Sequence, residues 1–234
     1  MAYFDDLDIP DWVQAVWSRP PKKGDILFRS VGSEEGNRDD WEMNAVVREA
    51  DDYAYSEGYR LAGYIVADHV IQKPLYADFL VYPIIFLYRH YVELQLKRLI
   101  PLGALLVDQV IDRKLLLKHP LDELWDLFAP VLKEAAQVTG AMTPEEIEGL
   151  GWYVSELNKF DPGSFSVRYP LDRRGVPCID NRKHPAINIG VLAEGMERLT
   201  GYLFGLGEAF REAHQFKCEM EGEARAEGMD YYDG

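Results

Sequence analysis

The most apolar long stretch of the chain is Tyr82–Ile100, with the sequence YPIIFLYRHYVELQLKRLI. Its apolar side chains recur at the three- and four-residue spacing of a broad helical face. A helix with so few polar positions must be largely buried against other helices. This stretch therefore predicts a helical bundle and lies at its centre.

A narrow polar stripe interrupts this apolar helix. Arg89, Glu93 and Lys97 follow one another at four-residue spacing, and His90 precedes Glu93 by three residues. At this spacing the four side chains project from one side of a helix. In a functional interpretation His90 is a general acid or base that Glu93 orients, and Arg89 or Lys97 holds a phosphate. In a structural interpretation the stripe is a partly buried ion-pair network, because a buried charge needs a partner.

The remaining sequence predicts an all-α protein, a bundle of four to six helices with a small β-hairpin before the last long helix. Besides the central helix we expect helices over residues 41–72, 105–117, 121–139, 143–158 and 186–216, and a short strand over 25–31. The segment 159–185 is rich in Pro, Gly and Arg, and it predicts hairpin strands at 164–169 and 176–179. We expect three parts: an N-terminal extension (1–40) packing on the body, a helical domain (41–216) and an acidic flexible tail (217–234).

Charge and composition limit the function. The 234 residues carry 40 acidic and 25 basic side chains, a net charge of −15. This field argues against a general nucleic-acid coat, so that any contact with RNA needs a local basic patch. Cys178 and Cys218 support neither a disulfide framework nor a zinc site, and they fit a cytoplasmic protein. We expect no metal and no cofactor. We also expect no membrane span, because no uninterrupted apolar run reaches about 18 residues.

Further candidate binding residues lie outside the central helix. Arg168 and Tyr169 complete a site with the stripe, or Arg168 pairs with an acid such as Glu93 and pins its loop. His119 is a functional residue or a helix cap. A basic cluster contacts RNA phosphates or an acidic partner, or is merely solvated; its members are Arg173, Arg174, Arg182, Lys183 and His184.

Three motifs follow one another in a set order. They are Tyr88-Arg89-His90-x-x-Glu93-Leu94-x-Leu96-Lys97, then Lys118-His119-Pro120-Leu121-x-x-Leu124, then Arg168-Tyr169-Pro170 before a closing helix. This order resembles the HEPN superfamily, helical bundles of prokaryotic toxin–antitoxin, defence and nucleotidyltransferase-associated proteins. The resemblance covers about residues 50–215. It implies a homodimer, because such domains often pair through their helices.

The resemblance implies a module of a bacterial defence or toxin–antitoxin system that binds RNA, a nucleotide or a partner protein, such as an antitoxin or effector, without hydrolysis. The alternative is a metal-independent endoribonuclease with Arg89, His90 and Glu93 as catalytic residues. HEPN ribonucleases usually carry an Arg followed four to six residues later by a His near the closing helix. Here Arg182 and His184 are only two residues apart. A third hypothesis is an acidic protein that mimics nucleic acid or neutralises a basic partner.

Overall fold

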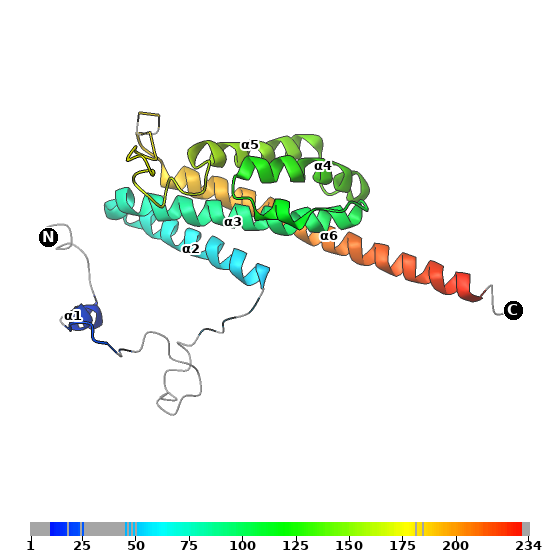
Figure 1. Cartoon of the computed structure of the whole chain (residues 1–234), viewed down its shortest axis with the longest axis horizontal. Coiled ribbons are helices and arrows are strands. Elements are labelled where there is room, and N and C mark those ends of the chain that lie inside the picture. Colours follow the sequence, from blue (N-terminus) through cyan, green and yellow to red (C-terminus); the bar gives the residue numbers. More distant parts are fainter. Residues whose placement is uncertain are drawn as a thin grey trace, which may run out of the picture. The chain divides into compact units, whose positions relative to one another are not determined.

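A computed structural model of the chain describes residues 10–17, 19–23, 25, 45, 47, 49, 51–180, 182–183 and 185–230 (Figure 1). The chain divides into two units, Met1–Glu49 and Ala50–Gly234. Within the described part of the first unit, the one regular element is the short helix α1 (Asp11–Trp17). The predicted strand at 25–31 lies outside the described residues except for Asp25, and the packing of the N-terminal extension on the body stays a prediction.

The second unit is helical, which confirms the predicted all-α class. Among the described residues it contains helices and no strand. The α-helices are α2 (Asp52–Gln72), α3 (Ala77–Leu106), α4 (Leu121–Thr139), α5 (Pro144–Phe160) and α6 (Ile189–Asp230), and the short 3-10 helices are η2 (Pro74–Tyr76) and η3 (Arg113–Leu117).

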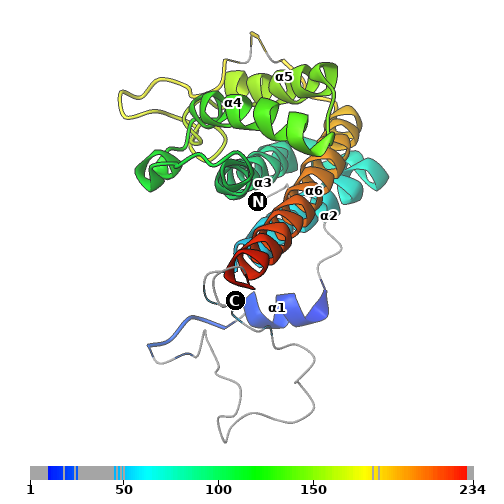
Figure 2. The same ribbon diagram turned by 90° about the vertical axis from the view of Figure 1, so that its right-hand side faces the viewer.

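Helix α3 is the centre of this unit, as its apolar sequence predicts. It packs against α2, α4 and α6, and α4 also packs against α5. Figures 1 and 2 show α2 on one side of α3 and the α4–α5 pair on the other. The α3 side chains at the core are fully buried, among them Ile84, Tyr88, Tyr91, Leu96 and Leu99. Removing this much apolar surface from water is the main force that holds the bundle together.

The ends of α3 differ from those predicted. The helix begins at Ala77 rather than near Pro83, and it continues through Pro101 to Leu106. Each proline removes one backbone hydrogen bond from a helix interior. Burial of the apolar face on both sides of these prolines outweighs that loss. The helix expected at 105–117 is therefore replaced by the end of α3, a loop and the 3-10 helix η3.

The predicted β-hairpin is wrong. Between α5 and α6 the described residues contain a single antiparallel bridge, between Leu171 and Pro177, and no strand. The Asp172 carboxylate accepts hydrogen bonds from the backbone N–H groups of Arg174 (2.8 Å) and Val176 (2.9 Å), so the side chain closes the turn. Pro177 has no N–H to donate to a ladder. The segment is thus a loop held by these side-chain bonds and by two backbone bonds, from Asp172 N–H to the Val176 carbonyl oxygen (2.8 Å) and from Cys178 N–H to the Pro170 carbonyl oxygen (3.1 Å).

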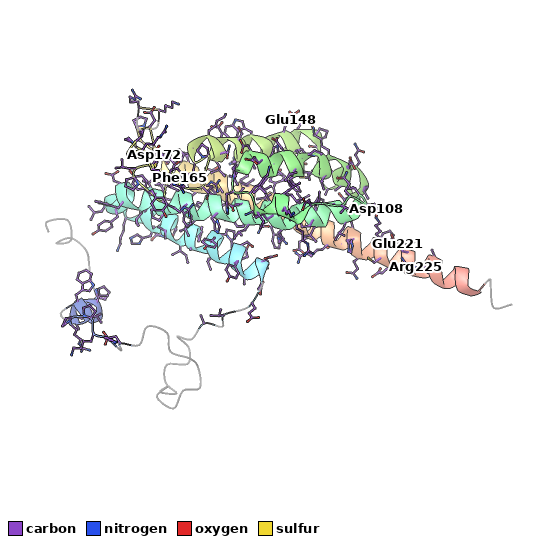
Figure 3. All side chains as sticks on the ribbon, in the orientation of Figure 1. Asp108, Glu148, Phe165, Asp172, Glu221 and Arg225 are labelled. Carbon is purple, nitrogen blue, oxygen red and sulfur yellow. The ribbon has the colours of Figure 1, made fainter. Side chains whose placement is uncertain are left out.

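Helix α6 continues well past its predicted end at Phe216, to Asp230. Lys217 attaches it to the end of α3, because its Nζ lies 2.6 Å from an Asp108 carboxylate oxygen and 3.4 Å from the Leu106 carbonyl oxygen. Figure 3 places Glu221 and Arg225 on the part of α6 that extends beyond the other helices. The predicted tail therefore begins as helix, and its flexibility stays a prediction.

No single helix in the described part of the chain is both long and apolar enough to cross a membrane. Helix α2 and the segment Pro74–Leu106 satisfy that criterion only as a pair, and they are bent by 113° at the break between them.

Candidate functional site

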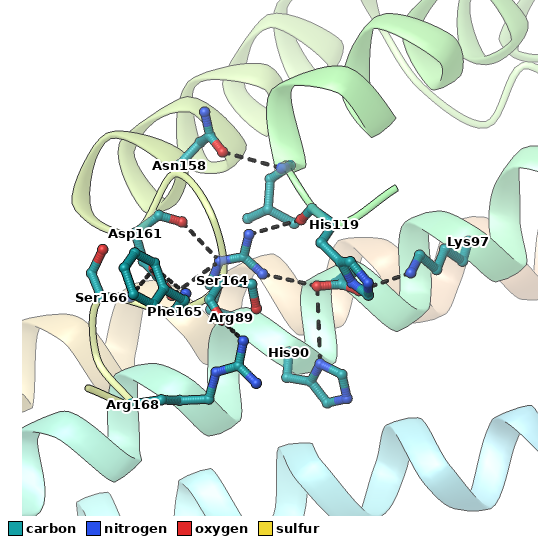
Figure 4. A network of polar contacts seen from close by, with 12 residues as sticks. Arg89, His90, Lys97, His119, Asn158, Asp161, Ser164, Phe165, Ser166 and Arg168 are labelled. Carbon is teal, nitrogen blue, oxygen red and sulfur yellow. Dashed lines mark hydrogen bonds and ion pairs between the residues drawn. The ribbon is translucent and has the colours of Figure 1, made fainter. Parts of the chain in front are cut away.

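Arg89 is a buried clamp. Its side chain has no exposed surface. It donates from Nη1 to the Glu93 carboxylate (2.9 Å), from Nη2 to the His119 carbonyl oxygen (2.8 Å) and from Nε to the Asp161 carbonyl oxygen (3.1 Å). Figure 4 shows these bonds joining α3 to the loop before α4 and to the end of α5. Arg89 therefore positions these segments and leaves no surface for a ligand.

Asp161 completes the clamp, and it is not among the site residues that the sequence predicts. Its side chain is fully buried, with Oδ2 3.4 Å from Arg89 Nε. Its Oδ1 accepts hydrogen bonds from the backbone N–H groups of Phe165 (2.8 Å) and Ser166 (2.7 Å). One carboxylate thus fixes the start of the α5–α6 loop. The Asp-Pro-Gly sequence at 161–163 signals a turn, but no local pattern reveals a buried arginine partner 72 residues earlier.

Glu93 is the carboxylate at the centre of the site. It is 1% exposed. Its Oε1 accepts from Lys97 Nζ at 2.8 Å and lies 2.8 Å from His119 Nδ1. Burial raises the pKa of this carboxyl, but the hydrogen bonds from Lys97, His119 and Arg89 together outweigh it and lower the pKa below its usual value. Glu93 is therefore ionised at neutral pH.

The Glu93–His119 bond fixes the state of the imidazole. An ionised carboxylate only accepts hydrogen bonds, so Nδ1 of His119 must carry the proton. The Nε2 atom of His119 remains available for another partner. The His119 side chain is 67% exposed, whereas Glu93 beneath it is buried. A buried carboxylate therefore orients an exposed histidine, the arrangement that a general acid or base requires.

His90 approaches the other oxygen of the same carboxylate. Its Nδ1 lies 4.0 Å from Glu93 Oε2. The ring stacks on Phe86 at a centroid distance of 5.7 Å, and the edge-on ring of Tyr59 is 4.4 Å away. Burial is the largest cause that lowers the pKa of His90; Glu93 raises it, and Lys97, Arg89 and Arg168 lower it further. The His90 ring is therefore neutral at pH 7.

Arg168 belongs to the same neighbourhood, but it does not pair with Glu93 as the structural interpretation expected. It donates a hydrogen bond to the Ser164 carbonyl oxygen, within its own loop. Its guanidinium carbon lies 5.6 Å from the Phe86 ring centroid, on the ring that stacks on His90. Figure 4 shows Arg168 and His90 on the same side of α3. Arg89, not Arg168, pins the loop.

Four side chains with exposed surface surround the buried Glu93, and we call them the rim: His90, Lys97, His119 and Arg168. The rim and the buried residues beneath it together contain three permanently charged cations and two carboxylates. The cations are Arg89, Lys97 and Arg168, and the carboxylates are Glu93 and Asp161. The local charge is thus positive in a chain with a net charge of −15. Such a site attracts anions.

The predicted basic cluster is divided. Arg174 pairs with Asp172 (2.9 Å) and Arg182 pairs with Asp180 (3.1 Å), so each of these exposed arginines has an acidic partner in its own loop. Arg173 and Arg174 line a groove of about 820 Å³ together with Tyr169 and Phe165. His184 lies outside the described residues. In the described part of the chain, no group of three His, Cys, Asp or Glu side chains is placed to bind a metal ion.

The chain matches no model of a known protein family, and no curated protein and no solved structure match it at a significant level. The resemblance to HEPN domains therefore rests on the three motifs alone. Two of these motifs meet at the site, because Arg89, Glu93 and His119 are hydrogen-bonded to one another.

Proposed function

We propose that the chain is a helical module that binds RNA or a nucleotide, with a phosphate held on the rim. The observation that carries the proposal is the 2.8 Å contact between the exposed His119 and the buried Glu93. It presents an oriented ring nitrogen to solvent beside the ammonium group of Lys97, which contacts the same carboxylate oxygen at 2.8 Å. Lys97 and Arg168 are cationic donors that suit the oxygens of a phosphate group, and His119 joins them when its ring is an imidazolium that donates from Nε2.

The biological setting is proposed from the resemblance to HEPN domains. We place the module in the cytoplasm, in a bacterial defence or toxin–antitoxin system, where a cognate antitoxin or effector protein is a further partner and a homodimer is the expected assembly. The purely acidic-mimic hypothesis is less well supported, because a nucleic-acid mimic has no need of a positive site above a buried carboxylate.

The test is RNA binding by the purified chain. A fluorescein-labelled single-stranded RNA dodecamer is titrated at low salt, and its anisotropy is measured for the wild type, Arg168→Gln and Arg225→Gln. Both substitutions remove one positive charge, but Arg225 is exposed near the far end of α6. We expect Arg168→Gln to weaken binding about tenfold, in the range of a charge-assisted contact. Equal Kd values for the two variants would reject the rim as the binding site.

A second candidate function is a metal-independent endoribonuclease, and the paired histidines favour it. Neutral His90 would take the proton from a ribose 2′-hydroxyl, whose oxygen attacks the adjacent phosphorus while the bond to the 5′-oxygen breaks. Protonated His119, stabilised by Glu93, would give its proton to the leaving 5′-oxygen. Lys97 would stabilise the charge on the phosphorane. The products are a 2′,3′-cyclic phosphate and a 5′-hydroxyl.

This candidate is tested by RNA cleavage in EDTA. His119→Ala is compared with His69→Ala, which changes an exposed histidine on α2. An endoribonuclease would lose about 100-fold or more of its activity with the first substitution and almost none with the second. Intact RNA with all three proteins, together with tight binding by the wild type, would leave the binding function and exclude the enzyme under these conditions.

A further inference from the structure

Tyr169 lines two grooves, and the second of them includes Arg168 of the rim. The first has a volume of about 820 Å³ and is lined by Phe165, Tyr169, Leu171, Asp172, Arg173 and Arg174. The second has a volume of about 400 Å³ and is lined by Tyr82, Ser166, Val167, Arg168, Tyr169, Pro170 and Ile179. The Tyr169 side chain is 55% exposed. An aromatic ring therefore stands open to solvent between two grooves that contain arginines.

Arg168 links this aromatic surface to the rim. Its guanidinium carbon is 5.6 Å from the Phe86 ring centroid and 5.9 Å from the Tyr169 ring centroid. Phe86 in turn stacks on His90. An anion that contacts Arg168 thus lies within one side-chain length of both His90 and Tyr169.

The charge around Tyr169 suits a negatively charged ligand with a planar group. Arg174 is paired with Asp172, but Arg173 forms no ion pair within the described part of the chain. Phe165 lies beside Tyr169 at a centroid distance of 6.0 Å. Aromatic rings next to arginines form the stacking platforms on which proteins bind single-stranded nucleic acids. Because every base has a π-face, such a platform needs an unpaired base and little particular sequence.

We infer that the groove beside Tyr169 binds an unpaired nucleobase whose adjoining phosphate lies at Arg168 on the rim. This inference rests on the phosphate site proposed above and names its ligand class, a nucleotide or strand with an unstacked base. A base within a duplex is stacked on its neighbours, so it cannot present its face to Tyr169 without disruption of the helix.

The experiment compares the single-stranded RNA dodecamer with the duplex that it forms with its complement, again by fluorescence anisotropy. Tyr169→Leu removes the ring and Tyr169→Phe keeps it. Tyr55→Leu is the matched control, because Tyr55 is 56% exposed on α2. We expect Tyr169→Leu to weaken binding of the single strand about 5- to 100-fold, the effect of losing one stacked base. Tyr169→Phe and Tyr55→Leu should stay within about twofold of the wild type.

Competition by uridine monophosphate and by inorganic phosphate distinguishes a ligand bound through its base from a ligand bound through its phosphate alone. Displacement of the strand by the mononucleotide, but not by phosphate at the same concentration, indicates a nucleotide site. Displacement by neither competitor shows that a longer strand is needed, and the comparison of Tyr169→Leu with Tyr55→Leu then decides whether that strand binds through a base. If uridine monophosphate and phosphate displace the strand equally well, binding does not need a base, and the inference is overturned.

Two further outcomes distinguish this inference from the proposed function. If Arg168→Gln weakens binding but Tyr169→Leu does not, or if duplex and single strand bind equally, the base subsite is overturned and the phosphate site stands. If the wild type binds neither RNA, both proposals are overturned.

Discussion

Arg89 and Glu93 show how one charged pair serves as both a structural element and the floor of a site. Their side chains are 0% and 1% exposed, respectively. Removing such charges from water is expensive, and their attraction offsets this cost only when the remaining hydrogen-bonding atoms are satisfied. Arg89 meets this condition with bonds to the carbonyl oxygens of His119 and Asp161. Removal of one partner therefore destabilises the folded protein, whatever net contribution the intact pair makes to stability.

Arg89→Ala should destabilise the protein by about 3–5 kcal/mol, because it leaves the carboxylates of Glu93 and Asp161 buried without this partner. Urea denaturation followed by circular dichroism measures the change. The control is Arg60→Ala, since Arg60 also pairs with two carboxylates, of Glu57 and Glu197, but is 25% exposed. We expect the control to cost about 1 kcal/mol or less. Similar losses for both variants would contradict a structural clamp at Arg89.

Acid should weaken the folded state through His90 and Glu93. The pKa of each is lower in the folded chain than in the unfolded one, so the unfolded chain binds protons more readily as the pH falls. Their contributions to stability are full at neutral pH. The His90 contribution is lost as the pH falls below 6.5, and that of Glu93 below 4.5.

The measurement is the urea midpoint between pH 7.5 and pH 5.5. The groups that act on His90 are Tyr59, Phe86, Arg89, Glu93, Lys97 and Arg168, and none of them has an ordinary pKa in this range. His90→Gln should therefore lessen the loss of stability on acidification, whereas His69→Gln should not. An unchanged difference between the two pH values in His90→Gln would show that His90 is not buried in its neutral form.

Among the elements, a capping signal located one helix start well, whereas other starts were misplaced, because the helix predicted over 41–72 begins at Asp52 and α3 begins at Ala77. Thr143 and Glu146 form a capping box at the start of α5, where the sequence predicts a helix start, and both reciprocal bonds are present (2.8 and 3.3 Å). Pro83 and Pro101 are equally strong local signals, yet both lie inside α3. Whether a proline ends a helix depends on the apolar surface buried beyond it, which the flanking residues alone do not reveal.

The candidate site was predictable to the same extent. The spacing of Arg89, His90, Glu93 and Lys97 was enough to find the stripe, because all four lie on one helix. The spacing could not show that Arg89 is buried while His90 keeps exposed surface. Asp161 could not be assigned, because its contact with Arg89 joins segments distant in the sequence. The hairpin prediction failed because the chain pairs there at a single bridge, and Pro177 in that bridge has no N–H to donate to a longer ladder.

Two helical glycines make a matched pair for testing how closely α3 packs. A Cβ atom at Gly103 would lie 2.9 Å from both Phe210 and Val131, whereas one at Gly58 on α2 would meet no atom within 4 Å. Gly58→Ala should stabilise the protein by about 0.5–1 kcal/mol, because alanine restricts the unfolded chain. Gly103→Ala should destabilise it by about 1–3 kcal/mol through overpacking. Thermal melts compare the Tm of each variant with that of the wild type. A higher Tm for Gly103→Ala would contradict the close contact between α3 and α6.

At the scale of the whole molecule, the described core lies entirely in the second unit. Its buried members run from Ala67 to Phe210, and the earliest described residue packed against it is Tyr59. A fragment of residues 50–234 should therefore unfold cooperatively, with a Tm within a few degrees of that of the whole chain. Calorimetry of both proteins makes the comparison. A markedly lower Tm for the fragment would show that the N-terminal extension packs on the body, as the sequence predicts.

The number of cations in the proposed site also predicts how RNA binding depends on salt. A strand that contacts Lys97, Arg168 and Arg173 releases counterions from about three phosphates, so a plot of log K against log salt should have a slope of about −2. Anisotropy titrations at several salt concentrations give this slope. A slope of −5 or steeper would mean that the strand follows a larger basic surface, and the rim would then be a minor contact.

A phosphate site above Glu93 is tested most directly by titration of the protein with single-stranded RNA. Long-range proton–nitrogen NMR follows the ring nitrogens of the histidines during the titration. The account predicts that the ring nitrogens of His119 and His90 shift with one common Kd, equal to that from anisotropy, because both rings border the phosphate. The signals of His69 on α2 and His214 on α6 should stay in place. Shifts of equal size at these four of the five histidines, or none at His119, would contradict a phosphate site above Glu93.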